Sequence, residues 1–181
     1  MEKLGLAHSL GVSLGFAAFH AFVGAIDLAT GEIQDAIHLI QQLRTLNIML
    51  NPARLQKMLD SNTVKQHTIR EIRDQDYVAE LQKVHITILA AYQLGANIAC
   101  AEGQTTTNND QARSIITMDI EQAVEFASTL NNAHIPLATT DLPGELTRMN
   151  AVTEPFDTLH NEFLFIRGKC QGILDTSPDP S

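Results

Sequence analysis

The chain has 181 residues and a formal net charge of −9 at neutral pH, from 12 Lys and Arg against 21 Asp and Glu. This length is enough for one domain with a shielded core, because chains of this size bury roughly 70% of the surface that the unfolded chain exposes. The acidic balance argues against a nucleic-acid partner, since phosphate contacts need a basic face that no stretch here provides. The excess of acid lies in the second half of the chain, so a basic protein partner would meet that half.

The first predicted helix lies in an uncharged run of 23 residues, Leu4 to Ile26. A signal peptide or a membrane span could have this length. Two histidines, two serines and four glycines interrupt the run, and Met1-Glu2-Lys3 lacks the net positive charge of a signal sequence. We expect the segment to be retained as a helix of a cytoplasmic protein without a membrane span, although the signal-peptide alternative stays open.

Two stretches of the chain resemble two later stretches in sequence. Leu10 to Ala17 aligns with Leu94 to Ala101, 84 residues further on, and Ile33 to Ile37 aligns with Ile120 to Val124, 87 residues further on. The offset changes within the polar stretch Gln104 to Gln111, where a loop would tolerate an insertion. Shared apolar spacing between unrelated amphipathic helices is the alternative explanation.

The repetition predicts an all-α fold in a single domain over residues 1–176. The fold is a helical bundle of two diverged copies of one helical unit, related by a pseudo-twofold axis and without a substantial sheet. Copy one spans about residues 5–87 and copy two about residues 88–175. The tail 177–181, Ser-Pro-Asp-Pro-Ser, cannot continue a helix and is expected to be disordered.

Apolar spacing and prolines place the other helices of copy one. Apolar residues recur every three or four positions from about Thr30 to about Asn47, which predicts a helix there. Asn51-Pro52 opens a short helix, because proline is tolerated at a helix start. From about Thr63 to Glu102 we expect one long helix, or two that meet at a bend. The run Val84 to Ile88 also alternates like a strand, but we predict it to be helical.

In copy two, Asp119 is expected to be the N-cap of a helix that begins at Ile120. Pro136 and Pro143 are expected to bound the end of that helix and the short segment after it. Thr153-Glu154-Pro155 starts the last helix.

Small residues occupy matching positions in the first helix of each copy. They are Gly11 and Gly15 in copy one, and Gly95 and Ala99 in copy two. Because a glycine within a helix costs roughly 1 kcal/mol against alanine, two glycines on one face suggest that another backbone approaches closely. We therefore expect the helices Leu6–Val23 and Ala90–Glu102 to contact each other through these residues.

Three aromatic residues flank that expected contact. They are Phe16, Phe19 and Tyr92, and they are candidates for the wall of an apolar ligand cleft between the copies or for the edge of a dimer interface. Aromatic residues at this spacing are also typical of a core.

Two Asp-x-x-His pairs are the outside candidates for a metal site. Asp35 with His38 and Asp157 with His160 place a carboxylate and an imidazole on one helix face, as di-iron bundles do. Those bundles use Glu-x-x-His and further glutamates, and the alignment pairs His38 with Glu125, so the two pairs are not equivalent. We expect no metal and no other cofactor.

Signatures of catalysis are scarce in the sequence. No nucleophile elbow or phosphate-binding glycine loop occurs, and Cys100 and Cys170, which form no metal-type spacing, are either two buried thiols or one disulfide. Ala7-His8-Ser9-Leu10 resembles the Ala-His-x-Leu of histidine phosphotransfer domains, which are four-helix bundles carrying a phosphorylated histidine. The Lys-Gly that normally follows is Gly11-Val12 here, so we assign no family.

These observations favour a non-enzymatic helical interaction protein: an adaptor, assembly or regulatory subunit that associates with itself as a homo-oligomer. The alternative is a binder of a small apolar ligand or cofactor between the two copies. A metal protein or enzyme that uses histidine and carboxylates is the third hypothesis.

Overall fold

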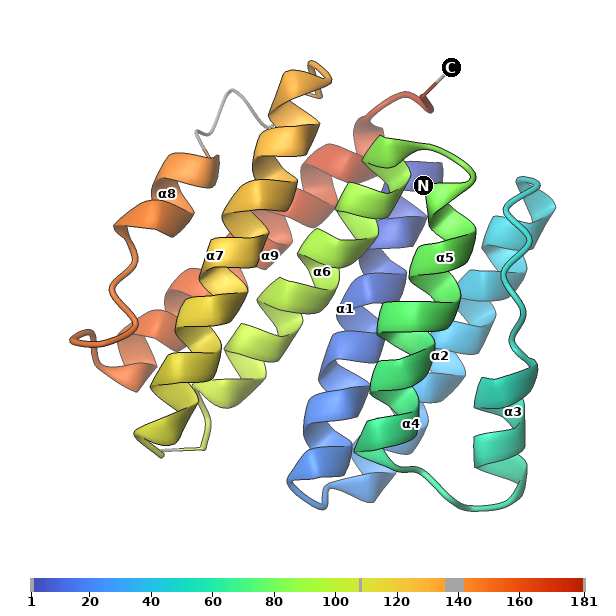
Figure 1. Ribbon diagram of the computed structural model, residues 1–181, viewed down its shortest axis with the longest axis horizontal. Coiled ribbons are helices and arrows are strands. Elements are labelled where there is room, and N and C mark those ends of the chain that lie inside the picture. The colour runs from blue at the N-terminus through green and yellow to red at the C-terminus, as the bar shows by residue number, and fades with distance from the viewer. Residues whose placement is uncertain (1, 108, 136–141, 181) are drawn as a thin grey trace.

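The computed structural model describes residues 2–107, 109–135 and 142–180, and within these ranges it contains helices and no strand. This confirms the predicted all-α class (Figure 1). The elements in chain order are α1 (Lys3–Phe22), α2 (Ile26–Thr45), α3 (Ala53–Asp60), α4 (Gln66–Glu71), the π-helix η1 (Ile72–Asp76), α5 (Tyr77–Gln82), α6 (Ile86–Gln104), α7 (Gln111–Asn132), α8 (Leu142–Arg148) and α9 (Phe156–Thr176).

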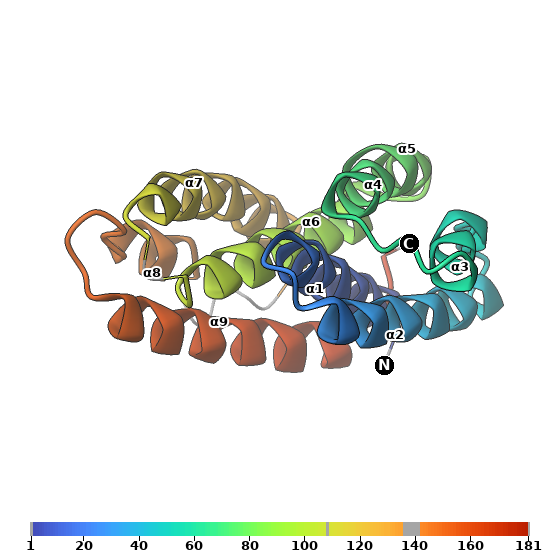
Figure 2. The same cartoon turned by 90° about the horizontal axis from the view of Figure 1, so that it is seen from below.

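Helices α1 and α6 form the centre of the molecule. Helix α2 packs on α1, and α7 packs on α6. Figure 2 shows α9 crossing one side of the central pair, while α4 and α5 lie on the other side. The two halves therefore surround their central helices in the same order, which is what a duplication would produce. Descent from one ancestral unit stays a prediction.

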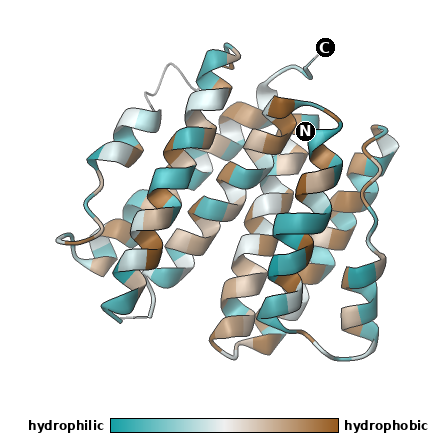
Figure 3. Ribbon diagram, in the orientation of Figure 1, coloured by the Kyte–Doolittle hydropathy of each residue, from teal (hydrophilic) through white to brown (hydrophobic). Residues whose placement is uncertain are grey.

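The apolar residues follow this arrangement. Figure 3 shows hydrophobic residues prevailing along α1, whereas α4, α5 and α7 carry hydrophilic faces toward the outside. Helix α1 is the one helix of the described chain long and apolar enough to span a membrane, and 67% of its most apolar window is buried against other helices. Its buried apolar side chains pack against the other helices of the core.

The structure corrects several predicted boundaries. Helix α7 begins at Gln111, so Asp119 lies within it and is not its N-cap. The reason is that the apolar stripe of α7 continues before Ile120: Ile116 and Ala112, one and two turns earlier, are also buried. Helix α2 begins at Ile26 instead of about Thr30. Pro143 lies inside α8, whereas Pro136 falls outside the described residues.

The long segment before Glu102 is two helical stretches that meet at a turn. The first ends at Gln82, and α6 begins at Ile86 with His85 as its N-cap, whose Nδ1 accepts a hydrogen bond from the backbone N–H of Thr87 at 3.1 Å. The part of the strand-like run from Ile86 onward is therefore helical, as predicted, and Val84 lies in the turn.

The tail expected to be disordered is described as far as residue 180. Ser177 is buried, and the Asp179 carboxylate accepts a hydrogen bond from the backbone N–H of Lys3 at 3.0 Å. These contacts bring the two ends of the described chain together.

Candidate ligand cavity beside helix α6

The small residues chosen from the sequence lie in the contact between α1 and α6. A Cβ added at Gly11 would overlap the carbonyl oxygen of Tyr92, and one added at Gly95 would overlap the carbonyl oxygen of His8. A Cβ at Gly15 would come within 2.7 Å of the Ala96 carbonyl oxygen and 2.9 Å of the Ala99 Cβ. The two backbones touch directly, which side chains larger than these would prevent.

The order of these contacts gives the direction of the two helices. Gly11 meets Tyr92, and Gly15, further along α1, meets Ala96 and Ala99, further along α6. Helices α1 and α6 therefore run in the same direction, side by side. With α6 held at the centre, its outer face becomes the floor between the α4–η1–α5 segment and α7.

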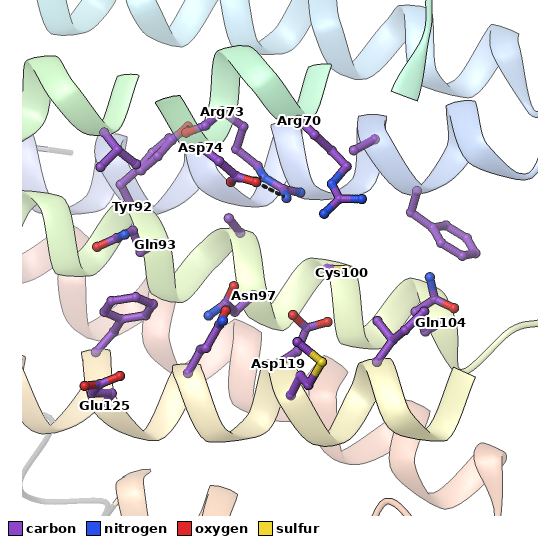
Figure 4. Close-up of a pocket in the computed structure, with 18 of the residues that line it drawn as sticks. Arg70, Arg73, Asp74, Tyr92, Gln93, Asn97, Cys100, Gln104, Asp119 and Glu125 are labelled. Atoms are coloured by element: carbon purple, nitrogen blue, oxygen red, sulfur yellow. Dashed lines mark hydrogen bonds and ion pairs between the residues drawn. The ribbon is translucent and has the colours of Figure 1, made fainter. Parts of the chain in front are cut away.

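A cavity of about 500 Å³ lies over this floor. Figure 4 shows Arg70 and Arg73 on its one side, facing Asn97, Cys100, Gln104 and Asp119 across open space. The first wall belongs to predicted copy one, and the floor and second wall belong to predicted copy two. The cavity is thus lined by residues of both proposed copies.

The arginine wall is shaped by the π-helix η1. Its apolar side is anchored by buried Ile69, Ile72 and Tyr77, in which the step of five residues from Ile72 to Tyr77 reflects the wider π turn. The carbonyl oxygen of Arg73 accepts a hydrogen bond from the Tyr92 hydroxyl at 2.7 Å, which ties η1 to α6. π turns are frequent at functional sites, and this one lies on the cavity.

The two arginines of this wall differ in their partners. The Arg73 guanidinium is largely buried and donates to both carboxylate oxygens of Asp74, at 2.7 and 2.9 Å. Arg70 is exposed to solvent and has no ion pair or side-chain hydrogen bond in the part of the chain described. Its charge acts on Asp119 and Cys100 across the cavity, and its exposed guanidinium is accessible to a ligand.

The opposite side carries polar groups that lack partners. Asp119 interacts with the Cys100 thiol, but its Oδ2 atom is buried without a hydrogen-bond partner, and so is the Nδ2 atom of Asn97. Burial raises the pKa of Asp119 to about 7, with Arg73 and Arg70 acting in the opposite direction. Burial also raises the pKa of the Cys100 thiol, so the thiol stays protonated at neutral pH.

Two of the three predicted aromatic wall residues line this cavity. Phe19 lies at one end, and Tyr92 lies on the floor. Phe16 does not line it: its ring faces the other side of α1, where the Arg167 guanidinium lies 5.2 Å from the ring centroid. The charged residues of the cavity were missed, because no spacing in the sequence connects Arg70 and Arg73, on α4 and η1, with Asp119 on α7.

The Asp-x-x-His pairs do not come together. Asp35 and His38 are exposed on α2, and Asp157 is exposed on α9. The His160 ring nitrogen Nδ1 lies 2.9 Å from the Thr105 hydroxyl, which occupies it. No group of three or more potential metal ligands occurs among the described His, Cys, Asp and Glu residues.

His8 and Cys170 are buried, whereas Cys100 is half-buried on the cavity. The His8 Nδ1 atom lies 2.6 Å from the Gln171 amide oxygen, and burial lowers the pKa of the imidazole to about 4. A fully buried ring cannot meet a phosphate donor, so the resemblance to phosphotransfer domains does not extend to the position of this histidine. Cys100 and Cys170 are both free thiols.

A second buried carboxyl occurs on α2. Glu32 lies 2.5 Å from the His20 Nδ1 atom, and burial raises the pKa of Glu32 to about 8 while it lowers that of His20. Both shifts favour a neutral pair. The predicted alignment places Glu32 opposite Asp119, so each half would hold one buried acid at the same place.

No family model matches the chain, and neither does any curated protein or solved structure in the comparisons.

Proposed function

We propose that the chain is a non-enzymatic binding protein that holds a small organic ligand in the cavity beside α6. The observation that carries this proposal is that two residues lining the cavity of about 500 Å³ each hold a buried polar atom without a hydrogen-bond partner, Asp119 Oδ2 and Asn97 Nδ2. A buried polar group without a partner costs about 1–3 kcal/mol, which a ligand that supplies the partner would offset. The volume also falls in the range of small-molecule sites.

Binding is favoured over catalysis by the groups on the cavity. Among its described lining residues there is no histidine, and the Cys100 thiol is held protonated by burial. A protonated thiol is a poor nucleophile, and burial raises the pKa of the Cys100 thiol well above that of Asp119, the carboxyl in contact with it, so the proton stays on the sulfur. The polar groups on the cavity can orient a ligand, and none of the described lining residues is identified as one that would cleave a bond in it.

Native mass spectrometry of the purified protein tests this proposal. We expect a retained small molecule or, after stripping, a ligand-dependent rise in melting temperature. Asn97→Leu should raise the melting temperature of the free protein, because it removes the unpaired amide, and should abolish ligand retention. Gln75→Leu, on the exposed face of η1, is the matched control and should leave retention unchanged. Retention that is identical in wild type and Asn97→Leu would refute the proposal.

Contact with a second copy of the chain is a second candidate function. The turn between α1 and α2 exposes Phe22, Val23, Ile26 and Leu28, of which Phe22 and Leu28 are 58% and 57% accessible. Neighbouring apolar side chains on the surface are typical of contact sites. We propose that this corner supports self-association, and that the more acidic second half is suited to a basic protein partner. The two free thiols favour a reducing compartment such as the cytoplasm.

Size-exclusion chromatography with light scattering tests the second candidate. The wild-type protein should be a dimer or larger, and Phe22→Ser with Leu28→Ser should be monomeric. Phe165→Ser, at an equally exposed phenylalanine on α9, is the control. A wild-type monomer at all concentrations would exclude self-association without affecting the ligand proposal.

A further inference from the structure

Arg70 brings an exposed positive charge to the cavity. Arg73 is paired with Asp74, but Arg70 has no ion pair among the described residues, and Asp119 opposite is buried with a pKa near neutrality. Figure 4 shows the Arg70 guanidinium aimed into the space above the α6 floor. Of the other acids on the cavity, Glu125 is exposed at the end away from Arg70.

We infer that the cavity binds an organic anion whose acid group lies between the Arg70 guanidinium and the Asn97 amide, and that binding shifts Asp119 to its protonated form. This inference rests on the proposed function, since it specifies the ligand of the same cavity. Arg70 and the Asn97 amide group can both donate to an acid oxygen, and a guanidinium is well suited to a planar carboxylate.

The groups around Asp119 explain why its carboxyl should become protonated when the anion binds. On α6 it faces Cys100 and Asn97; on α4 it faces Arg70, and on η1 it faces Arg73 and Asp74. Helix α8 and the start of α9 also contact α7, and none of their charged residues is among the groups that shift the pKa of Asp119. An anion at Arg70 offsets the favourable charge of that arginine and adds a like charge. Both effects favour neutral Asp119, whose O–H can then donate to the anion.

The rest of the ligand is expected to be apolar. Phe19 and Met118 line the same cavity as Arg70, and Phe126 lines it on α7. An aromatic or aliphatic group attached to the acid would contact these side chains and displace water from them. An organic acid with an apolar body therefore suits the cavity better than a small inorganic anion.

Titration calorimetry with matched probes tests the inference. Benzoate, benzamide and benzylamine share one shape but carry negative, zero and positive charge. Benzenesulfonate keeps its charge between pH 6 and pH 8, and inorganic phosphate represents a free anion without an apolar body. Benzoate and benzenesulfonate should bind at least about tenfold more tightly than benzamide or benzylamine, since tenfold corresponds to about 1.4 kcal/mol, within the range of one charge-assisted hydrogen bond. Phosphate binding as tight as that of benzoate would instead identify free phosphate as the ligand class.

The pH dependence tests the proton. If the anion binds only the neutral form of an acid with a pKa near 7, the dissociation constant should be about tenfold lower at pH 6 than at pH 8. Asp119→Asn mimics the neutral acid and should bind benzenesulfonate with little pH dependence. Calorimetry in buffers of different ionisation enthalpy should also show proton uptake by the wild-type protein and none by the variant.

Variants that each remove one positive charge test whether Arg70 binds the anion specifically or whether any positive charge on the protein attracts it. Arg70→Gln should lose the preference for benzoate over benzamide, whereas Lys57→Gln, at an exposed position on α3, should keep it. Both variants remove one positive charge, and their melting curves show whether they fold. Equal loss in the two variants would overturn the assignment of Arg70.

Different experimental results would refute the anion inference and the proposed ligand-binding function. If benzamide binds as tightly as benzoate and Asn97→Leu abolishes both, the cavity binds ligands but does not select anions. If no probe binds, the anion inference is wrong, and the ligand retained in native mass spectrometry decides the proposed function separately. A pH dependence that persists in Asp119→Asn would overturn the proton uptake alone.

Discussion

Gly11→Ala should destabilise the protein, although alanine is the better helix former. The added Cβ would overlap the Tyr92 carbonyl oxygen and lie 2.9 Å from the Ala96 backbone nitrogen. Both are backbone atoms, so the clash is relieved only by moving α1 and α6 apart. Overpacking costs about 1–3 kcal/mol in most cores, and a rigid backbone contact belongs at the upper end. After roughly 1 kcal/mol gained in helix propensity, we expect a net loss of about 1–2 kcal/mol.

Gly168→Ala is the matched control. Gly168 lies inside α9, and a Cβ there meets nothing within 4 Å. The same substitution should stabilise the protein by about 0.5–1 kcal/mol through helix propensity alone. Urea unfolding followed by circular dichroism measures both free energies. A Gly11→Ala protein as stable as wild type would refute the direct backbone contact.

The remaining predictions concern pH, metal, the first helix and the thiols. Asp119 and Glu32 have folded-state pKa values of about 7 and 8, above their ordinary values of 3.8 and 4.5, so the folded state holds protons that the unfolded chain releases. Their contribution to stability is therefore present at low pH and is lost as the pH rises from about 4 to 8. Asp119→Asn should be more stable than wild type at pH 9 and should lose that advantage at pH 5, by urea unfolding. The protein purified without added metal should contain no stoichiometric iron or zinc by elemental analysis; one equivalent that disappears in His38→Ala or His160→Ala would contradict this. Intact mass should show α1 retained, and deletion of residues 1–25 should abolish cooperative unfolding, because α1 packs on α2, α4, α6 and α9; recovery of the full chain only with detergent would count against its core position. Cys100 and Cys170 should react slowly with a thiol reagent at pH 8 until the protein is unfolded, because burial raises both thiol pKa values.

The helical class could be predicted because its signals are local. Apolar spacing and the prolines are read within one element, and they located α3 and α9 to within a few residues. The paired glycines indicated a close contact because a glycine inside a helix has a cost that packing must offset. Such arguments need no knowledge of which segment faces which.

To predict the charged residues of the cavity, one would need to know which segments face each other. Asp119 resembled an N-cap because it precedes an apolar repeat, and only the longer α7 places it within a helix facing α6. Arg70 and Arg73 look like solvated residues in the sequence, since nothing local shows that α4 and η1 face α7 across a gap. The step of five residues between Ile72 and Tyr77 was a local signal of the π turn.

The predicted alignment also suggests why the cavity lies over α6 and not over α1. It pairs Phe16 with Cys100 and His20 with Gln104, so the bulky rings of α1 stand where α6 has smaller or flexible side chains. The rings of Phe16 and His20 stack at 6.0 Å between centroids and fill the space on their side. The alignment pairs Glu32 with Asp119, and of these two acids it is Asp119 that lines the cavity.

The π turn of η1 should let the helix around it lose one residue without disturbing its buried positions. A π turn holds one residue more than an α turn, and the buried side chains on either side of it are already in register with the core. Removal of one exposed residue, such as Gln75, would turn the bulge into an ordinary helical turn and leave Ile72 and Tyr77 four positions apart, still on one face. The change in shape would fall on the side of the helix that carries Arg70 and Arg73. The length of this helix can therefore change by one residue, reshaping the cavity wall while the core keeps its pattern.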